Sequence, residues 1–117
     1  MLHKIRLSGP AFARVQSNAK TLELRLYDEK RQRIKLGDII EFFELPDLAA
    51  TVRAHVVGLL IYPTFASLID DIPTALMGYQ EADKDYLRTS MYEIYSPEDE
   101  AKYGALGIRF RLLGQSS

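Results

Sequence analysis

Apolar and polar residues alternate along several stretches of the chain, and this two-residue period predicts β-strands. The clearest stretch is TLELRLY (residues 21–27), in which every second residue is leucine and the residues between them are Glu23 and Arg25. Comparable patterns predict further strands at residues 2–7, 39–45, 51–62 and 105–113. Gly58 interrupts the longest of these strands, which is typical of a bulge or bend where a sheet curls.

Helical spacing and capping residues predict helices between these strands. Residues 8–18 begin with Ser-Gly-Pro, and Asn18 is suited to ending this helix in a left-handed conformation. Further helices are predicted at residues 64–72, 81–95 and 96–104. The order of strand, helix, three strands, a helical stretch and a final strand predicts an α+β fold, a small curled sheet or barrel with flanking helices. We expect one domain over residues 1–117, with a frayed end at Ser116 and Ser117.

The composition is that of an ordinary globular protein, with 47% hydrophobic and 26% charged residues. A formal net charge of −1 gives no global field that would hold a long polyanion, so any contact with nucleic acid is expected to be local. The absence of cysteine excludes a disulfide framework and thiolate metal sites, and it suits a reducing cytoplasm. Neither a signal peptide nor an unbroken apolar run is present, so we expect a cytoplasmic protein that does not span a membrane.

The charged residues around the 21–27 strand form the sharpest candidate site. If the leucines point into a core, Glu23 and Arg25 share the opposite face, with Lys20 just before them. Arginine offers a planar donor fork for a phosphate or a base edge, and glutamate accepts from an exocyclic amine or carries a proton. A partly desolvated lysine acts as a base or a nucleophile. Spacing alone leaves two interpretations open, an ordinary solvated face or the floor of a site for one nucleotide.

The stretch NAKTLELRLYDEKRQRIKLGDIIEF (residues 18–42) resembles the ASCH domain (activating signal cointegrator homology), which belongs to the PUA-like β-barrel superfamily. The family motif is Gly-x-Lys-x-x-Glu-x-Arg. Its three functional residues match Lys20, Glu23 and Arg25, whereas Asn18 replaces the glycine. Asparagine is the commonest non-glycine residue in left-handed backbone, so the turn can survive. MYEIYSPEDEAKYGALGI, later in the chain, also resembles small stand-alone members, so the resemblance covers nearly the whole sequence.

The resemblance implies a PUA-like barrel with a cleft and, as is common in that superfamily, binding of RNA. It also implies an enzymatic alternative, because some small bacterial members are amidohydrolases that remove the acetyl group from acetylated cytidine, and a ribonuclease activity is described within the family. In the amidohydrolase pattern the motif lysine is catalytic, with a threonine three residues after it and a separate glutamate. Lys20 matches the lysine, but Glu23 stands where the threonine is expected, which is a departure from that mechanism.

Two further groups are candidate ligand contacts. The first is a dense charged loop whose basic residues are Lys30, Arg31, Arg33 and Lys35. This loop is either a solvated turn or a set of phosphate contacts at the rim of the cleft. The second group is Tyr92 and Tyr95, which are three residues apart on a predicted helix and therefore share a face. Their rings either stack on bases or cover the open end of the barrel.

The sequence therefore predicts a protein that binds RNA or a nucleotide in a polar cleft on a β-barrel. The predicted ligand contacts are Lys20, Glu23, Arg25, Lys30, Arg31, Tyr92 and Tyr95. Two alternatives stay open. One is a small hydrolase that uses Lys20 and Glu23 on acetylated cytidine or single-stranded RNA, and the other is a protein-interaction module whose cleft is filled by its own side chains. We expect no metal and no cofactor, because His3 and His55 are far apart and no ligand spacing surrounds them.

Overall fold

The computed structural model describes residues 1–114, in which five strands and four α-helices follow one another in the predicted order. The strands are β1 (Leu2–Leu7), β2 (Leu22–Leu26), β3 (Ile39–Glu44), β4 (Thr51–Tyr62) and β5 (Ala105–Leu112). The α-helices are α1 (Gly9–Gln16), α2 (Phe65–Asp71), α3 (Lys84–Ile94) and α4 (Pro97–Tyr103). Three short 3₁₀ helices are η1 (Arg31–Arg33), η2 (Thr74–Met77) and η3 (Glu81–Asp83).

These elements match the predicted ones except in two respects. The helix predicted at 81–95 is divided into η3 and α3, and the other boundaries shift by one or two residues. The frayed end predicted at Ser116 and Ser117 lies outside the described residues. None of the helices in residues 1–114 has the length and apolar sequence needed to cross a membrane.

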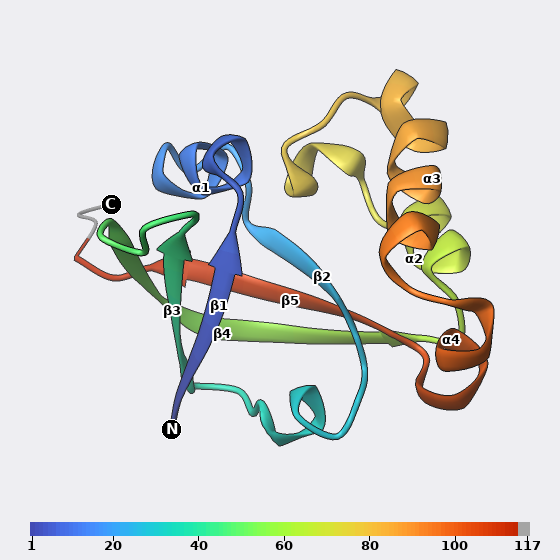
Figure 1. Cartoon of the computed structure of the whole chain (residues 1–117), viewed down its shortest axis with the longest axis horizontal. Helices are drawn as coiled ribbons and strands as arrows, with labels where there is room; N and C mark the ends of the chain where they lie inside the picture. Colours follow the sequence, from blue (N-terminus) through green and yellow to red (C-terminus); the bar gives the residue numbers. More distant parts are fainter. Residues whose placement is uncertain (115–117) are drawn as a thin grey trace.

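The strands form one sheet in the order β1-β3-β4-β5-β2, so β1 and β2 are its two edges. β1 runs parallel to β3, and the other neighbouring pairs are antiparallel. The register between β4 and β5 shifts between Val56 and Gly58, which confirms the predicted bulge. A bulge increases the local twist of a sheet. The sheet is curled into a half-barrel, with β4 and β5 as its longest strands and β1 crossing over them (Figure 1).

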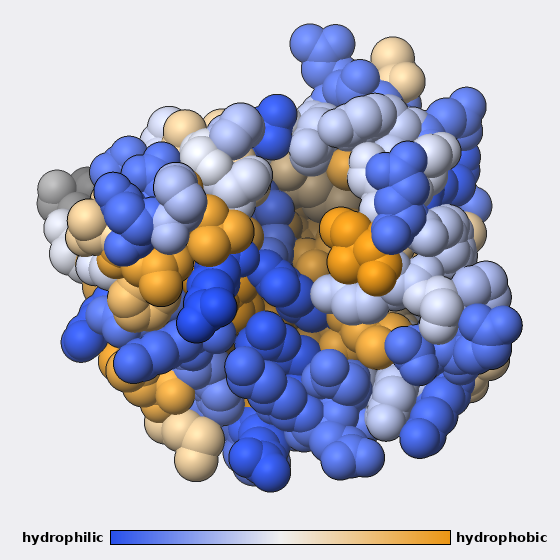
Figure 2. All heavy atoms as spheres, in the orientation of Figure 1, coloured by the Kyte–Doolittle hydropathy of each residue, from blue (hydrophilic) through white to orange (hydrophobic). Residues whose placement is uncertain are grey.

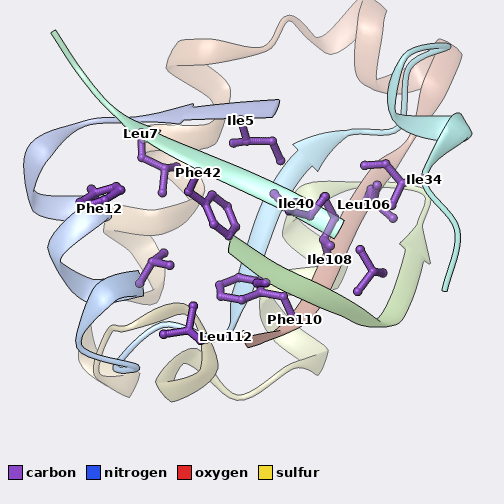
Figure 3. Packing of buried hydrophobic residues seen from close by; sticks show 13 residues of the cluster. Ile5, Leu7, Phe12, Ile34, Ile40, Phe42, Leu106, Ile108, Phe110 and Leu112 are labelled. Atoms are coloured by element: carbon purple, nitrogen blue, oxygen red, sulfur yellow. The ribbon is translucent and has the colours of Figure 1, made fainter. Parts of the chain in front are cut away.

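The concave side of the half-barrel holds the first of two hydrophobic cores. Its side chains come from β1, α1, β3, β4 and β5 and from Ile34, which follows η1. Phe42 and Phe110 meet in this core with ring centroids 4.9 Å apart (Figure 3). The buried residues are Ile5, Leu7, Phe12, Val15, Ile34, Ile40, Phe42, Ala54, Val56, Leu106, Ile108, Phe110 and Leu112. This core fixes the curvature that brings the two sheet edges toward each other.

The second core lies between the other face of the sheet and the helical layer. The three leucines of β2 pack there against α2, η2 and α3, which stand to one side of the sheet in Figure 1. The buried residues are Leu22, Leu24, Leu26, Phe65, Leu68, Ile69, Met77, Leu87 and Ala105. Two of the helices in this layer begin at predicted caps, where Thr64 accepts from the N–H of Ser67 and Ser96 accepts from the N–H of Asp99.

Candidate functional site

The charged residues of β2, Glu23 and Arg25, lie on the face of the strand opposite its leucines, and side chains on both faces are buried or partly buried. The antiparallel register sets Glu23 opposite Ile108 and Arg25 opposite Leu106 of β5, so these side chains point to the concave side of the half-barrel. The leucines of β2 point the other way, into the second core, which confirms that they are core residues. Glu23 is only 4% exposed, so the interpretation of this row as an ordinary solvated face is wrong.

Lys20, Glu23 and Arg25 form one ion cluster. The Nζ of Lys20 donates to Oε1 of Glu23 at 2.6 Å. The Nη2 and Nε of Arg25 donate to Oε2 of Glu23 at 2.8 and 3.0 Å. Both carboxylate oxygens are thus engaged by cations, and two cations around one anion leave the cluster with a net positive charge.

The turn before β2 brings Lys20 into this cluster. Asn18 has a φ of 65°, the left-handed conformation expected of it in place of the motif glycine. After this turn, the N–H of Lys20 donates to the carbonyl of Arg14 at 3.0 Å, and the N–H of Thr21 donates to the carbonyl of Leu76 at 2.8 Å. These bonds tie the segment to α1 on one side and to η2 on the other, so the position of Lys20 is set by backbone contacts.

Arg25 also links the two edges of the half-barrel. Its Nη2 donates to the carbonyl of Arg6 in β1 at 3.1 Å. Edge strands carry backbone groups that have no partner within the sheet. Arg25 supplies such a partner across the seam, and it lies where β1 and β2 approach each other.

Burial and charge act in opposite directions on this cluster. Burial raises the pKa of Glu23, but the charges and hydrogen bonds of Lys20 and Arg25 outweigh it and hold that pKa below its usual value. Burial lowers the pKa of Arg25, whereas Glu23, with a smaller contribution from the hydroxyl of Tyr95, raises it above its usual value. Glu23 is therefore an anion and Arg25 a cation at neutral pH.

A cleft of about 380 Å³ opens over the cluster, between the half-barrel and α3. We call it the aromatic cleft, because Tyr79, Tyr86 and Tyr95 line it together with apolar side chains of α3 and with Lys20, Glu23 and Arg25. The rings of Tyr79 and Tyr86 have centroids 6.0 Å apart. Figure 2 shows a hollow in the middle of this face, with apolar side chains on its helical side. The cleft is open, unlike the filled cleft expected of a protein-interaction module.

The structure brings Tyr95 to the aromatic cleft but not Tyr92. α3 ends at Ile94, and Tyr95 follows it with extended backbone (φ −118°, ψ 136°). The ring of Tyr92 packs edge-on against Phe65, with centroids 6.4 Å apart. Tyr95 lines the cleft and stacks on Phe65, with centroids 5.2 Å apart. Tyr92 instead donates its hydroxyl to Glu100 at 2.8 Å. Both tyrosines thus contact Phe65, as a common face implies, but only Tyr95 lines the cleft, where Tyr79 and Tyr86 supply the other rings.

A second cavity, of about 520 Å³, adjoins the aromatic cleft. This basic cavity is lined by Lys4, Arg6, Arg25, Lys30, Arg31, Phe43 and Leu48. Lys30 and Arg31 of the charged loop line this second cavity and not the aromatic cleft, at whose rim they were predicted. Arg33 and Lys35 of the same loop are among the lining residues of neither cavity. Burial and the nearby charge of Arg25 lower the pKa of Arg31, because no anion fully balances the positive charges around it.

The predicted ligand contacts did not include Tyr79 and Tyr86 of the aromatic cleft, nor Lys4 and Arg6 of the basic cavity, which lie on β1. The outward direction of Lys4 and Arg6 follows from the alternation in β1, where Ile5 and Leu7 are buried between them and beside them. Their meeting with η1 does not follow from any local pattern, because it depends on the curl of the sheet. In Figure 2, hydrophilic side chains gather beside the hollow, over β1 and the turn between β2 and β3.

The titratable groups of the two cavities form the Lys20-Glu23-Arg25 ion cluster and the set of cations around the basic cavity. Among residues 1–114, no group of three or more histidine, aspartate or glutamate side chains is placed to hold a metal ion. His3 is engaged by Asp38, with Nε2 and Oδ2 2.8 Å apart. The chemistry that the two cavities offer is that of fixed charges and aromatic faces.

A curled half-barrel of five strands with flanking helices, and a Lys-Glu-Arg cluster under an open cleft, defines an ASCH or PUA-like protein. The model of the ASCH domain matches residues 5–114, and the chain therefore belongs to the ASCH domain family. The resemblance noted from the sequence is confirmed over nearly its whole length.

Solved structures agree with this assignment. The crystal structure of the hypothetical protein PH0355 is similar over 97% of this chain and 100% of its own, with a TM-score of 0.82 and 26% identity. The solution structure of protein PF0455 from Pyrococcus furiosus is similar over 98% of this chain and 100% of its own, with a TM-score of 0.73 and 25% identity. An ASCH protein from Zymomonas mobilis shares the fold at 13% identity, with a TM-score of 0.61 over 94% of this chain and 66% of its own. No curated protein matches the chain.

Proposed function

We propose that the protein binds RNA or a nucleotide in the aromatic cleft and recognises one nucleotide at a time. The observation that carries this proposal is the buried Lys20-Glu23-Arg25 cluster on the floor of an open cleft whose walls hold tyrosine rings. A base ring stacks on tyrosine, and base–aromatic stacking contributes about 1–3 kcal/mol per base. The charged groups of the floor offer hydrogen bonds to the edge of a stacked base or to its phosphate.

The cost of the ion cluster supports a role in binding. Placing a carboxylate between two cations in a poorly solvated position costs desolvation energy, and well-packed apolar residues are often equally stable in such positions. The apolar neighbours of Glu23 on β2 and β5 could accommodate such a replacement. A cluster with little benefit for stability, placed under an open cleft, is consistent with a ligand that uses it.

The size and charge of the molecule favour a single nucleotide over a long duplex. The net charge of −1 supplies no broad field for a polyanion. Sequence-tolerant recognition of unpaired bases relies on aromatic faces in a groove, which is what the aromatic cleft offers.

The test is a panel of the four ribonucleosides and short single-stranded RNAs, measured by thermal shift and by fluorescence anisotropy of labelled RNA. We expect the wild type to bind, and Lys20→Ala and Tyr86→Ala each to weaken binding by about tenfold or more, as loss of a charge-assisted contact or of one stacking ring predicts. Tyr86 is 62% exposed, so its loss costs little stability. Lys35→Ala, which removes the same charge outside both cavities, should bind normally. If Lys20→Ala and Tyr86→Ala bind with the same affinity as the wild type, the ligand does not bind in the aromatic cleft.

A hydrolytic function is the second candidate, and the observation that favours it is the 2.6 Å contact of Lys20 with the carboxylate of Glu23 inside a cleft. Acetylated cytidine and single-stranded RNA are the substrates to try, with products resolved by chromatography. Turnover that is absent in Lys20→Ala would support catalysis. Binding without turnover would leave the protein a binding module.

A further inference from the structure

The basic cavity contains positive charge that the protein does not neutralise. Of its five cationic residues, Arg25 is paired with Glu23. Within residues 1–114, the other four, Lys4, Arg6, Lys30 and Arg31, take part in none of the salt bridges. Two acids, Asp28 and Glu29, directly precede Lys30 in the sequence, and neither takes part in a salt bridge within the part of the chain that the structure describes. Asp28 instead accepts the backbone N–H of Arg31 at 3.0 Å.

These cations come from three separate segments of the chain. Lys4 and Arg6 lie on β1, Arg25 lies on β2, and Lys30 and Arg31 lie at η1. Like charges brought together without a counter-ion destabilise a fold. Their convergence around a cavity of about 520 Å³ is therefore a cost that an anion of matching size would offset.

The two cavities share a wall. Arg6 and Arg25 line both of them, and the hydrogen bond from Arg25 to the carbonyl of Arg6 holds this wall together. One side of the wall has tyrosine rings and the Lys20-Glu23-Arg25 cluster, and the other side has only cations and two apolar residues. Each cavity has a volume in the range of small-molecule sites, about 300–1,000 Å³.

We propose that the two cavities form one bipartite site for a nucleotide, with the base in the aromatic cleft and the phosphate in the basic cavity. This inference rests on the proposed function and adds the phosphate as a required part of the ligand. Arginine pairs bidentately with phosphate oxygens, and Arg31 and Arg6 are both lining residues of this cavity. Lys30 adds a point charge at the rim.

A phosphate accounts for the cavity better than a carboxylate does. A phosphomonoester carries nearly two negative charges at neutral pH and presents three oxygens, so it engages several cations at once. A single carboxylate would leave most of the four unpaired cations without a counter-ion. The position of Arg25 between the two compartments would let it contact both the sugar-phosphate and the base edge.

The experiment is calorimetric titration of the protein with cytidine, adenosine, guanosine and uridine, and with their 5′- and 3′-monophosphates. We expect a monophosphate to bind at least about tenfold more tightly than its nucleoside, as charge-assisted hydrogen bonds of this kind predict. Arg31→Ala and Lys30→Ala should each remove most of this gain and leave nucleoside affinity unchanged. Arg33→Ala, which removes a neighbouring guanidinium from the same turn but outside the cavity, should keep the full gain.

Two RNA trinucleotides, one with a 5′-phosphate and one with a 5′-hydroxyl end, identify the source of the phosphate. Tighter binding of the 5′-phosphorylated form indicates that the basic cavity takes the phosphate of a free nucleotide or of an RNA end. Equally tight binding of both forms indicates that it takes an internal phosphodiester. Either result supports the bipartite site. If nucleosides bind and no phosphate adds affinity, the bipartite site is wrong and the proposed function stands. If neither nucleosides, nucleotides nor RNA bind, both are wrong. A gain that survives in Arg31→Ala and Lys30→Ala would place the phosphate elsewhere.

Discussion

Glu23 holds the candidate site together at the scale of single residues. Its carboxylate is shared by Arg25 of the same strand and by Lys20 of the turn that precedes it. A buried ion pair contributes little net stability, but removing one of its members destabilises the fold strongly, because the remaining charge is left buried without a partner. The cluster is therefore more sensitive to the loss of its anion than to the loss of either cation.

Glu23→Gln should lower the free energy of unfolding by about 2–4 kcal/mol at pH 7, since it leaves two poorly solvated cations without their counter-ion. The measurement is urea denaturation followed by circular dichroism. Glu93→Gln, on the exposed side of α3, is the matched control and should change stability by less than about 0.5 kcal/mol. A Glu23→Gln protein as stable as Glu93→Gln would show that the carboxylate does not compensate the two cations.

At the scale of elements, the turn before β3 anchors the edge strand β1. Asp38 accepts the backbone N–H of Lys35 at 3.0 Å and contacts the ring of His3 in β1 at 2.8 Å. The hydrogen bond with His3, followed by that with Lys35, lowers the pKa of Asp38 to about 2. This anchor matters for the site because β1 carries two cations of the basic cavity, Lys4 and Arg6.

The lowered pKa of Asp38 predicts a loss of stability in acid. A carboxylate whose pKa is lower in the folded state stabilises the protein above its unfolded pKa, about 3.9, and loses this contribution as the pH falls through its folded pKa. Between pH 5 and pH 2, the free energy of unfolding of the wild type should fall by about 1 kcal/mol more than that of Asp38→Asn. The difference is modest because the Asp38 carboxylate is partly solvated. Urea midpoints measured across this pH range provide the check. Parallel curves for the two proteins would contradict the assignment.

At the scale of the whole molecule, the half-barrel and the helical layer are joined by shared strands. Leu106 and Ile108 of β5 belong to the first core, and Ala105 of the same strand belongs to the second. β2 contributes its leucines to the second core and its charged row to the concave side. The aromatic cleft lies between these two layers, so its shape depends on both cores.

Because the layers share β2 and β5, we expect the chain to unfold in one cooperative transition. Leu106→Ala in the first core and Leu68→Ala in the second should each lower the free energy of unfolding by about 2–5 kcal/mol, as is typical of buried leucines. Circular dichroism follows the backbone as a whole, and tyrosine fluorescence mainly follows the helical layer, where Tyr62, Tyr79, Tyr95 and Tyr103 pack. The two signals should change together in both variants. A Leu68→Ala protein whose fluorescence changes before its circular dichroism would show that the layers unfold separately.

Local pattern was enough to predict the elements and the members of the ion cluster. The two-residue period of β2, the glycine of the β4 bulge, the helix caps and the left-handed Asn18 all depend on backbone geometry within a few residues. The spacing of Lys20, Glu23 and Arg25 likewise placed one anion beside two cations. Local pattern also predicted a common face for Tyr92 and Tyr95, and both rings contact Phe65, but it did not show that only Tyr95 lines the aromatic cleft.

The amino-acid sequence by itself determined the order of strands and helices, the family, and the residues of the cluster, because each follows from short-range periodicity or from a motif. Only the tertiary structure decided that both faces of β2 are buried, that an open cleft lies over Glu23, and that Lys4 and Arg6 meet Lys30 and Arg31 around a second cavity. These features arise when the curl of the sheet and the packing of two cores bring segments together that are distant in the chain. No periodicity along a single segment carries that information.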